Sequence, residues 1–134
     1  MKRLSGQCLC GDVSFTCEDN FDEFHLCHCI QCQKTSGSAH VANLFTHRNN
    51  ITWLSGKERV SKFDVPGRNI STAFCSICGS PVPYLTQDSM TLIVPAGCLD
   101  TPPTMKPQDT IFWHERASWY EAGIESPKFD GFPT

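Results

Sequence analysis

Apolar residues recur along the chain at the short spacing typical of β-strands. Between Val13 and Cys17, apolar side chains alternate with Ser14 and Thr16, which indicates a strand with one face toward a core. Further short apolar runs follow, separated by turn-forming Asn, Asp, Gly and Pro residues. We expect strands at residues 41–45, 51–54, 60–63, 70–74, 81–85, 90–94 and 110–114. Many short strands at close spacing predict a mainly β domain of antiparallel sheets.

Helical patterning is limited to one short segment. Residues from Cys29 to Ser36 are expected to form a helix that ends at Gly37, because glycine readily adopts the left-handed conformation that follows a helix. Three prolines mark residues 101–108 as a loop, and the tail from Glu115, which contains Pro and Gly, is expected to be irregular. No internal repeat or linker divides the sequence, so we expect a single domain over residues 1–134.

Composition narrows the class of protein. Hydrophobic residues make up 40% of the 134 positions and charged residues 19%, which leaves enough apolar material for a folded core. The formal net charge of −3 argues against a general nucleic-acid binder. No apolar run approaches the roughly 20 residues that cross a bilayer, and no apolar signal stretch follows the basic start. We therefore expect a cytoplasmic protein that binds neither nucleic acid nor membrane.

The cysteines carry the strongest chemical signal. There are nine, an odd number, and a reducing compartment disfavours the alternative of a disulfide framework. Seven of them fall into three tight clusters, which are Cys8-x-Cys10, Cys27-x-Cys29-x-x-Cys32 and Cys75-x-x-Cys78. Closely spaced thiols can gather around one metal ion, with zinc–sulfur bonds of about 2.3 Å. The spacing therefore predicts zinc binding.

Seven thiolates suggest one complete site and one incomplete site. A structural zinc takes four ligands in a tetrahedron, and three thiolates are then left over. Cys27, Cys29 and Cys32 are so close in sequence that they can hold one metal among themselves. The structural zinc is then expected on the outer pairs, Cys8, Cys10, Cys75 and Cys78. Such a site would clamp distant parts of the chain together.

The second site has two interpretations. With three cysteine ligands, its zinc would keep a fourth position for water or substrate, as catalytic zinc sites do. Alternatively, a fourth side chain closes it. The candidates for that fourth ligand are Cys17, Cys98, His25, His28 and His40. The isolated cysteines also fit the role of small buried hydrophobes, whereas His47 is expected in a solvated loop and His114 in a strand.

Three sequence motifs surround the clustered cysteines. They are GQCLCGDV at residues 6–13, CHCIQCQK at 27–34 and FCSICGS at 74–80. In this order and spacing they resemble the motifs of the glutathione-dependent formaldehyde-activating enzyme family, which includes centromere protein V. The tail from residue 111 to 133, with Trp113, Trp119 and Phe132, is similar to the C-terminal segment of that family. The resemblance spans nearly the whole chain.

The resemblance implies a fold, cofactors and an activity. The fold would be a β-tent of bent antiparallel sheets clamped by a structural zinc, and two zinc ions per chain are expected. The first would lie on the outer cysteine pairs and the second on Cys27, Cys29 and Cys32. The implied activity is that of a carbon–sulfur lyase. It would add glutathione, or a similar thiol, to formaldehyde or another small aldehyde to give an S-hydroxymethyl adduct, and it would catalyse the reverse step.

A mechanism follows from the open zinc site. A thiol bound to zinc loses its proton and becomes a nucleophile at neutral pH. Three thiolates already donate charge to this zinc, so we expect thiol activation rather than carbonyl polarisation. His28 or Lys34 could transfer a proton, although either side chain could equally point to solvent. Aromatic residues could form a pocket wall or simply the core, and these are Phe45, Trp53, Phe112, Trp113 and Trp119. The alternative function is a non-catalytic zinc module that carries a thiol or binds a protein.

Overall fold

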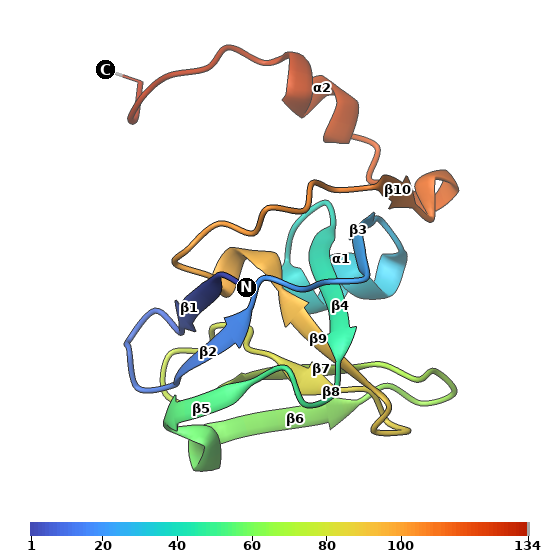
Figure 1. The fold of residues 1–134 in the computed structure, drawn as a ribbon. Coiled ribbons are helices and arrows are strands. Elements are labelled where there is room, and N and C mark those ends of the chain that lie inside the picture. Colours follow the sequence, from blue (N-terminus) through green and yellow to red (C-terminus); the bar gives the residue numbers. More distant parts are fainter. Residues whose placement is uncertain (134) are drawn as a thin grey trace.

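In the computed structural model, which describes residues 1–133, the strands form three sheets (Figure 1). The first sheet has the order β1 (Arg3–Gln7), β2 (Ser14–Glu18), β5 (Thr52–Ser55). The second has the order β10 (Asp109–Ile111), β3 (Glu23–Cys27), β4 (Val41–His47), β9 (Thr91–Pro95), β8 (Tyr84–Leu85). The third is the hairpin of β6 (Val60–Asp64) and β7 (Ser71–Cys75). The prediction of a mainly β protein is confirmed.

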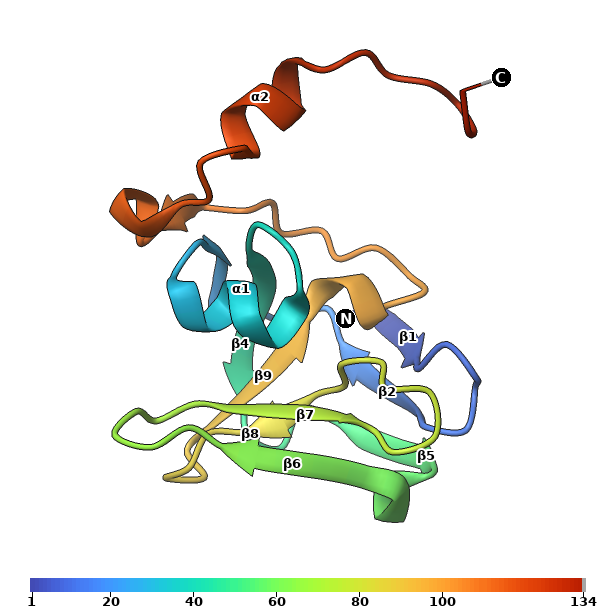
Figure 2. The same ribbon diagram turned by 180° about the vertical axis from the view of Figure 1, so that it is seen from behind.

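All strand pairs except one are antiparallel. The exception is β10, which pairs in parallel with β3. This pairing places a late part of the chain beside His25 and Cys27. Figure 2 shows the β6–β7 hairpin crossing the base of the molecule, with helix α1 (Ile30–Ser36) above it. This arrangement places the tip of the hairpin beneath α1.

The hydrophobic core is divided into several small clusters. One lies on the first sheet around Leu4 and Phe15, and another lies on β3, β4 and β9 around Leu44. Gly6 leaves room for the Phe15 ring, which the side chain of any larger residue would strike. A further cluster packs directly around the cysteines, with Cys8 and Cys75 among its buried members. Cysteines are therefore part of the apolar core as well as candidate metal ligands.

Helix α1 forms as its sequence predicts. The Cys29 sulfur caps its first turn by accepting a hydrogen bond from the Cys32 N–H at 3.3 Å. Gly37 ends it in the left-handed conformation with φ of 65°. Short 3-10 turns form at η1 (Lys57–Arg59), η2 (Ala96–Cys98) and η3 (Trp113–Glu115). None of the helices within residues 1–133 is long and apolar enough to span a membrane.

Some predicted boundaries are wrong. The strand expected at 110–114 ends at Ile111, because Phe112 turns the backbone with a positive φ of 54° and η3 follows. Of the strand expected at 81–85, only Tyr84–Leu85 forms, since prolines at 81 and 83 have no N–H to donate. The hydropathy pattern also missed β1 and β3 as strands.

The C-terminal segment is not entirely irregular, as had been expected. It forms the short helix α2 (Tyr120–Glu125), which Figures 1 and 2 show standing away from the sheets. Tyr120 at the start of α2 still packs against the body of the protein, as described below. Beyond it, large apolar side chains are exposed, and these are Ile124, Phe129 and Phe132.

Candidate functional site

Four cysteines from two distant turns come together in space. Cys8 and Cys10 lie just after β1, Cys75 ends β7, and Cys78 follows in the next turn. Their four sulfur atoms all lie within 4.8 Å of one another. The Cys8 and Cys10 sulfurs are 3.6 Å apart, and those of Cys10 and Cys75 are 3.9 Å apart. This is the set of ligands that the spacing predicted for a structural metal.

Each of the two turns folds back through a glycine in the left-handed conformation. Gly11 has φ of 80° and Gly79 has φ of 78°, a conformation that other residues rarely adopt. The turns are also joined directly, since the Leu9 N–H donates to the Ser80 hydroxyl at 3.0 Å. The same hydroxyl lies 3.2 Å from the Cys78 sulfur and, with backbone N–H groups, lowers the pKa of that thiol to about 5. A thiol of low pKa offers a thiolate to a metal at neutral pH.

The second cluster is built from local structure alone. Cys27 is the last residue of β3, Cys29 is the N-cap of α1, and Cys32 lies in its first turn. Their sulfurs also lie within 4.8 Å of one another. All three side chains are buried. A strand end followed at once by a helix start therefore brings together three thiols from only six positions.

No fourth ligand joins this cluster within residues 1–133. No other Cys, His, Asp or Glu there places a ligand atom within 4.8 Å of all three sulfurs. Cys17 is buried in the core of the first sheet, and Cys98 lies in η2. His25 pairs instead with Glu23 at 2.8 Å and Asp109 at 2.5 Å. His28 and His40 also lie outside the cluster.

The three thiols are electrostatically unequal. A hydrogen bond from Cys32, together with N–H and thiol groups of Cys29 and the charge of Arg68, lowers the pKa of Cys27 to about 6 despite its burial. The same interaction with Cys27, and burial, raise the pKa of Cys32 far above its ordinary value. Cys27 therefore forms a thiolate readily, whereas a bound cation has to displace the proton of Cys32.

Both clusters fit a metal by their chemistry. Buried thiolates that converge on one point suit soft or borderline cations such as zinc. The two groups, Cys8, Cys10, Cys75, Cys78 and Cys27, Cys29, Cys32, could each hold a metal ion. Four ligands complete a tetrahedron, whereas three leave one position for another group.

His28 is a buried ring that packs among aromatic side chains beside the three thiols. Its ring is fully buried, with centroids 4.8 Å from His40, 5.2 Å from Trp113 and 4.6 Å from Tyr120. Burial, followed by the charges of His40 and Arg116, lowers the pKa of His28, so the ring is neutral. The alternative in which His28 points to solvent is therefore wrong. Lys34 does lie exposed on α1.

The C-terminal segment holds the loop that carries the three cysteines. The Gln33 side-chain amide donates to the His28 carbonyl at 2.8 Å and to the Glu115 carbonyl at 3.0 Å. The Ile30 N–H donates to the Glu115 carboxylate at 3.0 Å. Gln33 lies in the CHCIQCQK motif, but neither its contact with residue 115 nor the role of Glu115 was indicated by the sequence, because these contacts join residues 82 to 85 positions apart.

A cavity of about 710 Å³ opens beside the three-cysteine cluster. Cys27 and Cys32 form part of its wall, and residues of β4, β7 and β9 form much of the rest. Among the aromatic residues singled out in the sequence, Phe45 and Phe112 line the cavity. Trp53 instead packs against Phe15 in the core, Trp113 covers His28, and Trp119 is exposed.

These features define a class of protein: a mainly β domain with two cysteine clusters that could hold metal ions, and a cavity lined by Cys27 and Cys32 of one cluster and by Cys8 of the other. Residues 3–115 match the family model described as glutathione-dependent formaldehyde-activating enzyme. The chain belongs to this family. The expectation drawn from the three cysteine motifs is thereby confirmed.

Similarity to individual proteins is more distant. The crystal structure of a Rhodobacter sphaeroides protein from the Northeast Structural Genomics programme is 18% identical to this chain. It aligns with a TM-score of 0.60 over 79% of this chain and 98% of the other. At this identity the likeness shows the fold alone. No curated protein matches the sequence.

Proposed function

We propose that this protein is a zinc-dependent enzyme of the carbon–sulfur lyase type. It would add glutathione, or a similar thiol, to formaldehyde or another small aldehyde, and it would also catalyse the reverse step. Membership of the family supports this activity. The observation that carries the proposal is the set of three buried thiols, without a fourth protein ligand in residues 1–133, beside a cavity of about 710 Å³.

Each part of the site has a role in this proposal. Cys27, Cys29 and Cys32 would hold the catalytic zinc, which would supply acidity to a bound thiol when present. The cavity would place the aldehyde beside the thiol sulfur, and Phe45 and Phe112 would exclude water from part of its wall. The sulfur–carbon bond forms as the carbonyl double bond opens. The proton released by the thiol ends on the carbonyl oxygen, so the adduct keeps every atom of both substrates.

The other cluster would have a structural role. A zinc on Cys8, Cys10, Cys75 and Cys78 would clamp the turn after β1 to the turn after β7. With the sheets bent around it, residues 1–134 would form one domain of the β-tent type. Closed four-thiolate sites leave no position for a substrate, which separates this role from catalysis.

The experiment is a rate measurement on protein of known zinc content. Exchange between free and S-hydroxymethyl glutathione is followed by magnetisation-exchange NMR with formaldehyde present. We expect the exchange rate to rise in proportion to protein and to return to the spontaneous rate in Cys29→Ser. Cys17→Ala, which alters a cysteine outside both clusters, is the matched control and should retain the acceleration. If zinc-loaded protein gives no acceleration with glutathione or smaller thiols, the enzyme proposal fails and the non-catalytic zinc module is favoured.

A further inference from the structure

The charged residues of the cavity wall are few. Among residues 1–133, Arg68 is the one lysine or arginine that lines the cavity, and Asp100 is the one carboxylate. Arg68 lies in the turn between β6 and β7, outside the three cysteine motifs. The sequence therefore gave no indication that this arginine reaches the site.

One edge of the Arg68 guanidinium is already occupied by the cysteine loop. Its Nη1 donates to the Gln31 side-chain oxygen at 2.8 Å and to the Cys29 sulfur at 3.7 Å. The guanidinium carbon lies 5.6 Å from the centroid of the Phe112 ring, so the plane is also supported by an aromatic side chain. Within residues 1–133, neither Nε nor Nη2 of Arg68 donates a hydrogen bond to another residue. Arg68 is an exposed side chain that lines the cavity, so these donors are available to a ligand there.

The charge of the three-cysteine cluster makes this cation important. Three thiolates carry one more charge than a divalent metal neutralises, so the loaded cluster would repel an anionic ligand. Arg68, whose Nη1 contacts the Cys29 sulfur, would balance that excess in the loaded cluster. A planar guanidinium with two adjacent donor nitrogens, Nε and Nη2, matches the geometry of a carboxylate better than a lysine would. The same residue can therefore neutralise the cluster and receive an anionic group.

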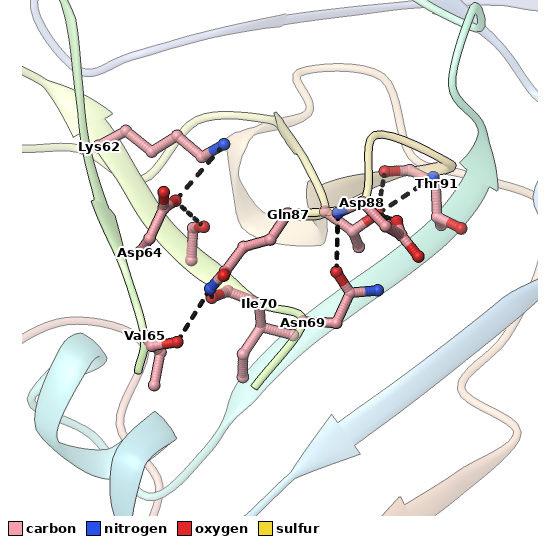
Figure 3. Close-up of polar contacts among 10 residues, drawn as sticks. Lys62, Asp64, Val65, Asn69, Ile70, Gln87, Asp88 and Thr91 are labelled. Carbon is pink, nitrogen blue, oxygen red and sulfur yellow. Dashed lines mark hydrogen bonds and ion pairs between the residues drawn. The ribbon is translucent and has the colours of Figure 1, made fainter. Parts of the chain in front are cut away.

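A separate network holds the turn that carries Arg68 (Figure 3). The Gln87 side-chain amide donates to the backbone carbonyl of Val65 at 2.9 Å and to that of Ile70 at 2.7 Å. These two carbonyls stand at the two ends of the turn. The Asp88 N–H donates to the Asn69 side-chain oxygen at 2.9 Å. Gln87 thus connects the β8–β9 turn to both ends of the segment that presents Arg68.

We propose that Arg68, positioned by Gln87, binds a carboxylate of the substrate thiol, so that the cavity selects thiols that carry a carboxylate. The inference rests on the proposed function, because it assigns the thiol to this cavity. Arg68 contacts the substrate in this proposal and determines specificity. Gln87 acts through Arg68 and is a positioning residue.

The test compares two thiols of equal chain length, 3-mercaptopropionate and 3-mercaptopropanol, which differ in charge. Binding of each to zinc-loaded protein is measured by calorimetry without aldehyde. We expect the native protein to prefer the carboxylate. In Arg68→Gln, binding of 3-mercaptopropionate should weaken about ten- to hundredfold, the loss typical of a charge-assisted hydrogen-bonded pair, with little change for the alcohol. Arg48→Gln, an exposed arginine in a turn outside the cavity, is the matched control and should keep the native preference.

Two more variants separate recognition from structure. Arg68→Lys keeps the charge but not the planar fork, and it should retain both metals while losing part of the preference. Gln87→Ala should weaken 3-mercaptopropionate binding about three- to tenfold without changing binding of the alcohol, because it loosens only the turn that carries Arg68. Zinc content is measured for each variant. If Arg68→Gln loses zinc, the comparison is made in Arg68→Lys.

The outcomes distinguish this inference from the proposed function. Equal affinity for both thiols in the native protein, or a preference that survives in both Arg68 variants, would overturn the inference. If Gln87→Ala weakened the binding of both thiols equally, the role of Gln87 would be merely structural. That result would contradict its assignment as a positioning residue. A preference that depends on Arg68, in protein that does not accelerate the aldehyde reaction, would support the inference and contradict only the enzyme proposal.

Discussion

The two cysteine clusters use the same chemistry but differ in how the chain builds them. The four-cysteine cluster joins a turn near the N-terminus to a turn some 65 residues later, as the contact between Cys10 and Cys75 shows. The three-cysteine cluster needs only the end of β3 and the first turn of α1. A metal in the first cluster would close the fold, whereas a metal in the second would add little to the chain connectivity. Long-range ligands therefore suit a structural role, and local ligands free the metal for chemistry.

The cluster that is expected to react has the more deeply buried thiols. In the four-cysteine cluster, Cys10 is exposed and Cys78 is partly exposed, whereas the three thiols of the other cluster are all buried. Cys27 and Cys32 of the buried cluster line the cavity, and Trp113 of the C-terminal segment packs on the adjoining His28. In the proposed function, a substrate would therefore reach the second cluster through the cavity, not through thiols exposed on the surface.

The largest effect should follow loss of one ligand from the four-cysteine cluster. In Cys75→Ser we expect cooperative folding to be lost, because a structural zinc site contributes on the order of 10 kcal/mol, as much as the whole stability of a small domain. Thermal unfolding followed by circular dichroism, with zinc content, makes the measurement. Ser76→Ala, in the same turn but not a ligand, should unfold like the native protein. A folded Cys75→Ser protein with both metals bound would remove the distinction between the clusters.

Loss of a ligand from the three-cysteine cluster should spare the fold. In Cys29→Ser the serine can still cap α1, so we expect a loss of stability of about 1 kcal/mol, while one metal equivalent is lost. Chemical unfolding and metal analysis on the same preparation give both values. If this variant unfolds as completely as Cys75→Ser, the second metal is structural.

Metal removal should proceed in two steps. A chelator should take the metal first from the three-cysteine cluster, because three protein ligands hold it less completely than four. Zinc release is followed with a chromogenic chelator while circular dichroism reports the fold, which should persist through the first phase. Cys29→Ser should show only the slow phase. Release in one phase, or loss of the fold during the first phase, would contradict the comparison.

The smallest effect should be the change with pH in the free energy of unfolding that His25 contributes beside the three-cysteine cluster. Hydrogen bonds to Glu23 and then Asp109 raise the pKa of His25, which links β3 to β10. A raised folded-state pKa means that the stabilisation is complete below the unfolded value of about 6.5 and is lost as pH rises through the folded value.

Because Glu23 and Asp109 are half exposed, the His25 contribution should stay below about 1 kcal/mol. Unfolding free energies of native protein and His25→Gln are compared at pH 6 and pH 8.5. The two proteins should differ more at pH 6. A difference that grows with pH would show that the sign is wrong.

The spacing of residues in the sequence was sufficient to predict those structural features that depend on a few neighbouring residues. Cys27, Cys29 and Cys32 must lie close together once a helix starts at residue 30, and Gly37 ends that helix as its sequence predicts. Strand β1 shows the opposite case. Its sequence RLSGQ lacks strong alternation, and it becomes a strand because it pairs along its whole length with β2.

The sequence by itself determined the family, the mainly β class and the division of seven thiols into groups of four and three. It could do so because motif spacing and short-range periodicity are local properties of the chain. Only the tertiary structure decided that His28 is buried, that the C-terminal segment covers it, and that Arg68 reaches Cys29. Arg68 and Cys29 are 39 positions apart, and Trp113 and His28 are 85 apart. These contacts depend on how the turns and sheets pack, which no local pattern encodes.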